Sequence, residues 1–230
     1  MARILLEPAY VLHSRPFRET SLIVDAFTRE YGRVAVVARG AKSARSRWRN
    51  VLQPFRPLLL SWNQKSDLGT LTAADQVASP PALQAQSLYC GLYLNELLMR
   101  LLHRGDPHAE VFERYRLVLS ELASDTPPQP LLRVFEKHLL EAIGYAMLLD
   151  REYDNGEEVQ PQHWYDYQPQ RGPVLCTGQK SGRVSGAALL ALYAENLQAE
   201  NLPELRMLMR CVIGYHLGDK PLASLSLFSA

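Results

Sequence analysis

The spacing of apolar residues changes once along this chain of 230 residues, close to residue 79. Before that point, five short apolar runs recur at roughly ten-residue spacing, with proline, glycine and polar clusters between them. Such runs are typical of short strands, and five strands are the count of an OB-type barrel. Beyond that point, apolar residues recur every three or four positions, which predicts amphipathic helices. We therefore expect an α+β chain with two domains.

The predicted domains are an OB-type β-barrel over residues 1–78 and an α-helical domain over residues 79–230. The expected helices lie within residues 83–105, 106–124, 126–149, 185–197 and 202–218. Ser185 is expected to begin the fourth helix. Ser79 and Asp106 are predicted N-caps of the first two helices, because their side chains can accept hydrogen bonds from the free amides of a first helical turn.

A polar and irregular segment of about residues 150–183 is predicted to interrupt the helical domain. Six Asp or Glu residues lie between Asp150 and Asp166, and the run WYDYQPQRGPVLC at 164–176 suggests a small hairpin. The run TGQKSG at 177–182 superficially resembles a phosphate-binding loop. It lacks the required spacing of Gly, four residues and Gly-Lys-Ser/Thr, so we interpret it as a turn.

Charge is divided unevenly between the two predicted domains. Residues 1–78 carry a net charge of +6 and residues 79–230 a net charge of −5, although the whole chain has only +1. The window from Tyr31 to Ser66 holds eight Lys or Arg residues and no Asp or Glu. This asymmetry suggests two modules, of which the basic one faces a polyanion. The alternative is chance clustering of surface charge.

The densest basic run is RGAKSARSRWRN at residues 39–50, in the expected loop after the third strand. OB barrels bind oligonucleotides with a positive groove along the phosphates and with aromatic rings that stack on bases. The predicted binding residues are Arg39, Lys42, Arg45, Arg47, Trp48 and Arg49. The cations would contact phosphates without reading sequence. Trp48 could either stack on a base or pack onto the barrel.

No arrangement of residues indicates catalysis or a resident metal. Cys90, Cys176 and Cys211 are too far apart for a disulfide framework or a zinc-ligand pair to be inferred. There is no Gly-x-Ser-x-Gly elbow and no clear carboxylate cluster for a two-metal site. We expect no enzyme activity and no cofactor.

The sequence also lacks the marks of export or membrane insertion. Its first residues have no signal-peptide core, and no apolar run approaches the 18 or so residues of a membrane span. The expected location is the cytoplasm, with no membrane partner.

Three motifs near the start carry a resemblance to a known family. They are HSRP-x-x-ETSL at 13–22, F-T-x-E-x-G-R-V at 27–34 and RGAKS at 39–43. LQPFRPLLLSW, SLYCGLYLNELLMRLL and LLRVFEKHLLEAIGY continue the likeness in the same order. The chain resembles the RecO family of bacterial recombination mediators over nearly its whole length.

The resemblance implies an N-terminal OB fold, a helical C-terminal domain and a non-enzymatic role in DNA repair. Such proteins bind single- and double-stranded DNA and anneal complementary strands. With RecR, and in one pathway RecF, they help load RecA onto DNA covered by single-strand-binding protein. They also bind the acidic, Phe-ending tail of that protein.

For the tail-binding site, the resemblance points to Arg133 in LLRVFEKH, and Lys137 lies one helical turn later on the same face. A terminal carboxylate needs a charge-assisted donor beside an apolar slot. The alternative is two ordinary cations on a helix surface. Two departures from the family occur: the four-cysteine zinc module of some members is absent, and Ala223 and Leu225 replace two basic residues in the run GDKPLASLS.

Two other function classes stay open at this stage. An OB-fold RNA-binding factor would prefer structured RNA to single-stranded DNA. A nuclease with an appended OB domain would degrade DNA in a metal-dependent reaction.

Overall fold

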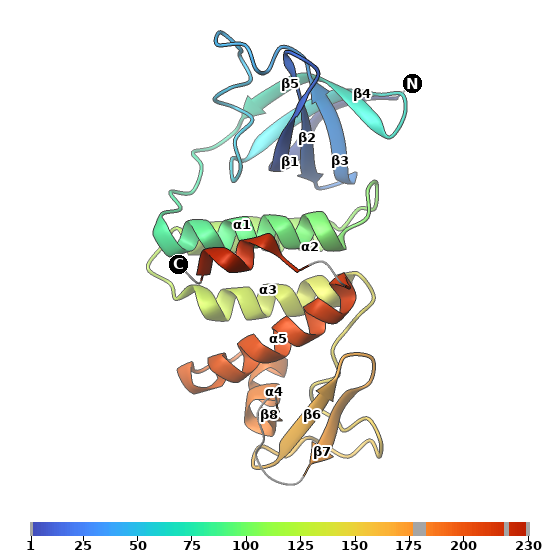
Figure 1. The fold of residues 1–230 in the computed structure, drawn as a ribbon, viewed down its shortest axis with the longest axis vertical. Coiled ribbons are helices and arrows are strands. Elements are labelled where there is room, and N and C mark those ends of the chain that lie inside the picture. The colour runs from blue at the N-terminus through green and yellow to red at the C-terminus, as the bar shows by residue number, and fades with distance from the viewer. Residues whose placement is uncertain (1, 177–182, 219–220, 229–230) are drawn as a thin grey trace. The chain divides into compact units, whose positions relative to one another are not determined.

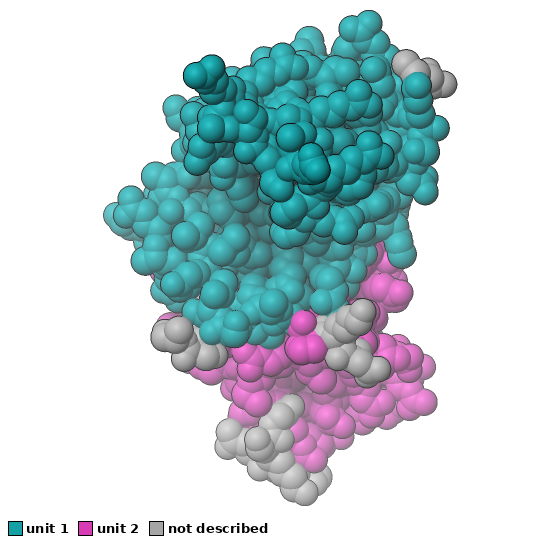
Figure 2. Space-filling view, turned by 45° about the horizontal axis from the view of Figure 1, so that its top comes forward, with its two compact units in different colours: residues 1–126, 222–230 teal, residues 127–221 magenta. Residues whose placement is uncertain are grey.

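The computed structural model describes residues 2–176, 183–218 and 221–228. The predicted turn at 177–182 lies outside these residues. The chain forms two compact units, one of residues 1–126 with 222–230 and the other of residues 127–221 (Figure 2). The first unit extends beyond the domain boundary predicted between residues 78 and 79. That boundary marks the change of sequence pattern, and it stays a prediction.

The first unit begins with a closed five-stranded barrel in the order β1-β2-β3-β5-β4 (Figure 1). Neighbouring strands pair antiparallel, except for the parallel pair of β3 and β5 that closes the barrel. The predicted OB-type fold is confirmed. The strands are β1 (Ala2–Phe17), β2 (Ser21–Thr28), β3 (Gly32–Ala38), β4 (Leu58–Gln64) and β5 (Leu68–Gln76).

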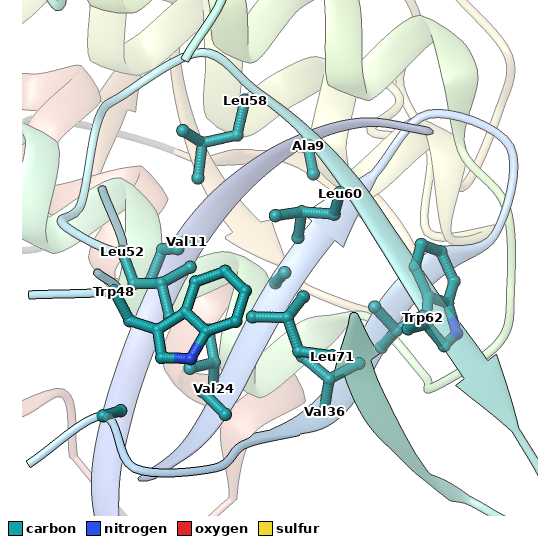
Figure 3. Packing of buried hydrophobic residues seen from close by; sticks show 14 of the residues in the cluster. Ala9, Val11, Val24, Val36, Trp48, Leu52, Leu58, Leu60, Trp62 and Leu71 are labelled. Carbon is teal, nitrogen blue, oxygen red and sulfur yellow. The ribbon is translucent and has the colours of Figure 1, made fainter. Parts of the chain in front are cut away.

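A single apolar cluster fills the barrel (Figure 3). Alternate residues of the strands point inward, as the two-residue period of a strand requires. Val24, Val36 and Leu60 are fully buried in this way. Trp48 and Leu52 join the cluster from the segment between β3 and β4, so this connection is part of the barrel core.

The turn between β2 and β3 has room only for glycine. Gly32 has a positive φ of 60°, and a Cβ atom there would lie 1.9 Å from the carbonyl oxygen of Asp106. The loop after the first helix therefore lies directly on this turn, and the Gly105 amide donates to the Arg33 carbonyl at 3.0 Å.

Two α-helices and a short C-terminal 3-10 helix complete the first unit: α1 (Ala85–Leu101), α2 (Ala109–Leu122) and η2 (Ala223–Phe228). Buried Asn95 of α1 links α1 and α2 to the barrel. Its Nδ2 donates to the Leu12 carbonyl at 3.0 Å, and its Oδ1 accepts from the Tyr115 hydroxyl at 2.5 Å. Tyr10 packs edge-on against Tyr115, with ring centroids 5.2 Å apart.

The second unit combines helices with a small sheet of order β7-β6-β8. The predicted hairpin at 164–176 is confirmed as β6 and β7. The elements are α3 (Pro128–Ala142), β6 (Trp164–Gln168), β7 (Gly172–Cys176), β8 (Val184–Ser185), α4 (Gly186–Tyr193), η1 (Ala199–Asn201) and α5 (Leu202–Leu217).

The fourth helix begins at Ser185 as expected, and the Ser185 hydroxyl accepts from the Ala188 amide at 3.2 Å. Both predicted N-caps are wrong. Ser79 does not cap α1, which begins at Ala85 with Gln84 as its N-cap, and Asp106 does not cap α2, which begins at Ala109 with His108 as its N-cap. The backbone of Asp106 instead lies against the glycine turn between β2 and β3, which delays the start of the helix.

Candidate nucleic-acid interface

The basic loop, residues 39–57, connects β3 to β4 and closes one end of the barrel with its apolar side chains. Trp48 is 6% exposed and, with Ala41 and Leu52, belongs to the barrel core (Figure 3). Its Nε1 donates to the Arg39 carbonyl at 3.1 Å. Of the two roles that the sequence left open for Trp48, the structure shows packing onto the barrel, because the ring is buried in the core.

Successive tight turns hold the basic loop in shape. The amides of Ser43, Ser46 and Arg49 each donate to the carbonyl three residues earlier, at 3.0 to 3.3 Å. The Lys42 amide also donates to the Thr20 carbonyl at 2.9 Å, which ties the loop to the turn between β1 and β2. All five predicted cations are exposed: Arg39, Lys42, Arg45, Arg47 and Arg49. The apolar side chains of the basic loop are thus buried in the barrel, and its five cations form an outer layer of positive charge.

Part of this layer surrounds a hollow of about 310 Å³. Three guanidinium groups and two hydroxyls line it, together with Trp48 and Leu71. The polar lining residues are Arg39, Ser43, Arg45, Ser46 and Arg47. Guanidinium forks and hydroxyls are the donors that phosphate oxygens accept from most readily. Lys42 and Arg49 do not line the hollow.

Arg47 is held in position by two contacts. Its guanidinium carbon lies 4.1 Å from the centroid of the Trp48 ring, and its Nη2 donates to the Thr72 carbonyl at 3.2 Å. A cation above an indole face is attracted by the ring quadrupole. Trp48 therefore orients the guanidinium of Arg47, a contact that sequence reasoning missed although the two residues are adjacent.

The predicted tail-binding residue Arg133 lies on the buried face of α3. It is 5% exposed, and its Nη2 lies 2.6 Å from Oε1 of the fully buried Glu136. Arg133 is therefore paired within its own helix in this structure, and its role in tail binding stays a prediction. The acidic partner stands three residues later in the same helix, a spacing that brings side chains together.

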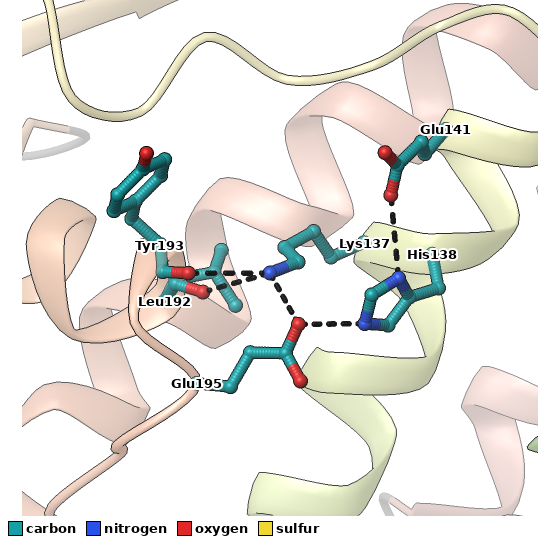
Figure 4. Close-up of polar contacts among 6 residues, drawn as sticks. All are labelled: Lys137, His138, Glu141, Leu192, Tyr193 and Glu195. Carbon is teal, nitrogen blue, oxygen red and sulfur yellow. Dashed lines mark hydrogen bonds and ion pairs between the residues drawn. The ribbon is translucent and has the colours of Figure 1, made fainter.

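The second predicted tail-binding residue, Lys137, is also paired within the chain (Figure 4). Its side chain is 14% exposed, and Nζ lies 2.6 Å from Oε1 of Glu195, just beyond α4. Nζ also donates to the Leu192 and Tyr193 carbonyls at 3.4 Å. Lys137 thus donates to the last carbonyls of α4, where a cation is favourable.

Glu195 is shared between Lys137 and His138, whose Nε2 lies 2.6 Å from the same carboxylate oxygen (Figure 4). Burial raises the pKa of Glu195, but the hydrogen bond from Lys137 and the charges of both cations outweigh it and lower the pKa overall. On its other side, His138 Nδ1 lies 3.3 Å from Glu141. This alternating cluster stabilises α3 against the end of α4.

Two general features bear on function. Among the described residues, no three His, Cys, Asp or Glu side chains gather in a way that could hold a metal ion. Within the same part of the chain, no helix combines the length and apolarity needed to cross a bilayer.

Comparison with known families decides the relationship. The family described as "Recombination protein O N terminal" matches residues 1–80, and "Recombination protein O C terminal" matches residues 83–226. The chain belongs to the RecO family. The resemblance stated from the sequence motifs is therefore confirmed.

Individual RecO relatives match over nearly the whole chain. A protein named DNA repair protein RecO from Nitrosospira multiformis is 45% identical over 220 residues, which cover 94% of this chain and 91% of the relative. The protein of the same name from Nitrosococcus oceani is 45% identical over 225 residues, with 96% and 92% covered. A third, from Thiobacillus denitrificans, is 45% identical over 231 residues, with 96% and 90% covered.

Sequence reasoning about this RecO chain located the exposed cations but missed what supports them. Ser43, Ser46 and Leu71 line the same hollow as the arginines. The two serines alternate with cations in the run KSARSR, which is a signal that could have been used. Leu71 lies on β5, more than twenty residues away along the chain, and no local pattern points to it.

Proposed function

We propose that this chain is a DNA repair and recombination mediator that binds single- and double-stranded DNA through the basic loop. The observation that carries the proposal is the hollow of about 310 Å³ lined by Arg39, Arg45 and Arg47. Its donors suit phosphate oxygens, and phosphates are common to both forms of DNA. Membership of the RecO family, whose relatives carry the name DNA repair protein, supports the same conclusion.

The proposed activity requires no bond chemistry. A positive surface that holds two strands raises their local concentration and reduces the repulsion between their phosphates. Complementary strands can then anneal, and weak, salt-sensitive contacts allow the duplex to leave. The chain would therefore act as a mediator in the bacterial cytoplasm and not as an enzyme.

The proposed partners follow from the family. They are the tail of single-strand-binding protein, RecR and, indirectly, RecA and RecF. For the tail, the structure adds a condition: Arg133 and Lys137 are already paired with Glu136 and Glu195. A tail carboxylate could reach either cation only by replacing that internal acid.

The salt dependence of DNA affinity tests the proposal. Changing Lys42, Arg45, Arg47 and Arg49 to Ala together should weaken binding of single-stranded DNA. It should also flatten the slope of log affinity against log salt by roughly 2–3, since each lost phosphate contact contributes about 0.7. The measurement is fluorescence anisotropy of a labelled oligonucleotide over a salt series.

A matched control removes four exposed cations elsewhere, at Arg3, Arg114, Arg206 and Arg210. It lowers the net charge equally and should leave the slope close to that of the wild type. Equal slopes for the loop variant and the wild type would reject the loop as the site. Higher affinity for structured RNA than for single-stranded DNA would favour an RNA-binding factor instead.

A further inference from the structure

A second cavity, of about 530 Å³, opens at the end of the barrel that carries the β2–β3 and β4–β5 turns. This volume is within the range of small-molecule sites. Ile4, Val34 and Trp62 give it an apolar floor, and Tyr31 forms part of its wall. Nothing in the proposed phosphate binding by the basic loop uses it.

Two guanidinium groups line the interior of the cavity. Arg104 is 42% exposed and lies 2.9 Å from Asp25, whose side chain is only 3% exposed. Arg33 donates through Nη1 to the Met99 carbonyl, and its buried Nε has no hydrogen-bond partner in the described part of the chain. Burial, followed by the nearby charge of Arg104, lowers the pKa of Arg33. Among the described residues, Arg104 has a carboxylate partner and Arg33 has none, so an anionic group is favoured beside Arg33.

The wall presents an aromatic ring that a ligand could contact. Tyr31 is 43% exposed and packs edge-on against buried Trp62, with ring centroids 5.5 Å apart. The exposed acids Glu30 and Asp67 stand at the rim, where they can accept hydrogen bonds from amino groups. An aromatic wall, an apolar floor, two guanidinium groups and acceptors at the rim match the base and the phosphate of a nucleotide.

One strand, β5, leads from the cavity to the hollow of the basic loop. Asp67, at the rim of the cavity, directly precedes β5, and Leu71 on β5 lines the hollow. Four residues of extended strand span about 13 Å. A flexible nucleic-acid strand can cover this distance and contact the cavity and the basic loop together.

We propose that this cavity receives one nucleotide of a single-stranded nucleic acid, with the base against Tyr31 and a phosphate beside Arg33 and Arg104. The inference rests on the proposed function and adds a preference to it. A base in a duplex is stacked and paired and cannot enter without being extruded, which costs a few kcal/mol. The cavity therefore favours single strands, while the basic loop holds both forms of DNA.

Tyr31 provides the test, because its exposed side chain can be truncated with little harm to the fold. Tyr31→Ala should lower affinity for an oligothymidylate about tenfold, the scale of one lost base–aromatic stack, and leave duplex affinity unchanged. Tyr31→Phe keeps the ring and should bind like the wild type. Tyr193→Ala, which removes an even more exposed tyrosine from the second unit, should also bind like the wild type.

A second measurement uses oligothymidylates with one 2-aminopurine at successive positions. At one position or more, the wild type and Tyr31→Phe should quench its fluorescence more than Tyr31→Ala does. Equal loss of single-strand and duplex affinity in Tyr31→Ala, or no loss, would overturn the inference and leave an acidic peptide with an aromatic residue as the better occupant. In that case the salt slope of the loop variant still decides the proposed function independently. A wild type that binds no DNA would overturn both.

Discussion

Trp48 shows how one residue can belong to the core and to a binding surface together. Its indole fills the barrel next to Leu52, and its Nε1 satisfies the Arg39 carbonyl. The ring also lies beneath the guanidinium of Arg47. Loss of the ring would therefore weaken the packing of the barrel core, and the hollow of the basic loop would be disturbed as a consequence.

Substitution of Trp48 should separate packing from stacking. Trp48→Ala should lower the free energy of unfolding by about 3–5 kcal/mol, the usual cost of truncating a buried aromatic residue. Trp48→Phe retains much of the volume and a face for Arg47, so its DNA affinity should stay near the wild-type value. Urea denaturation and anisotropy check these outcomes. A Phe variant of normal stability with strongly reduced DNA affinity would instead indicate a specific role for the indole in binding.

Glu195 links the end of α4 to α3, although its own backbone adopts an unfavourable conformation. It follows α4 with a positive φ of 55°, a conformation in which an L residue costs about 1–2 kcal/mol and glycine costs little. Its carboxylate contacts both Lys137 and His138 of α3. The side chain, and not the backbone, accounts for a glutamate at this position.

Glu195→Gln should destabilise the chain by about 1–2 kcal/mol at neutral pH, since it removes the charge from two charge-assisted hydrogen bonds. The folded-state pKa of Glu195 lies below its ordinary value of 4.5. Its contribution is therefore present above about pH 4.5 and is lost as pH falls through the folded-state pKa. The difference in unfolding free energy between wild type and Glu195→Gln should shrink in that acidic range, as urea denaturation at several pH values can show.

Two further substitutions measure the free-energy cost of the positive φ at Glu195. Glu195→Ala and Glu195→Gly both remove the carboxylate, but only the glycine relieves the positive φ. The glycine variant should be about 1 kcal/mol more stable than the alanine variant. Equal stability of the two would show that the backbone at Glu195 carries no strain.

Elements that depend on adjacent residues were predictable from sequence, whereas contacts between distant residues were not. The five strands, the hairpin at 164–176 and the start of the fourth helix at Ser185 follow from local pattern. Asp106 does not cap the helix, because its backbone packs against the turn at Gly32, more than seventy residues earlier in the chain. Likewise, the exposed cations of the basic loop were visible in the sequence, but the pairing of Lys137 with Glu195, 58 residues away, was not.

At the scale of the whole molecule, the C-terminal segment returns to the first compact unit after the chain has built the second. Leu222 and Ser224 are buried there. The amides of Ala223 and Ser224 each donate to the Glu96 carboxylate of α1 at 2.8 Å, and the Ser224 hydroxyl donates at 2.5 Å. Glu96 thus caps η2 and fastens it to α1.

Removing this attachment should loosen the first unit. Deletion of residues 222–230 should lower its stability by about 3 kcal/mol, from the lost burial of Leu222 and the lost hydrogen bonds to a charged group. Glu96→Gln in the full chain keeps the burial and should cost only about 1–2 kcal/mol. Hydrogen exchange of the α1 amides measures both effects, with α3 amides as an internal control that should change less. Unchanged protection of α1 after the deletion would mean that η2 rests on the helix without stabilising it.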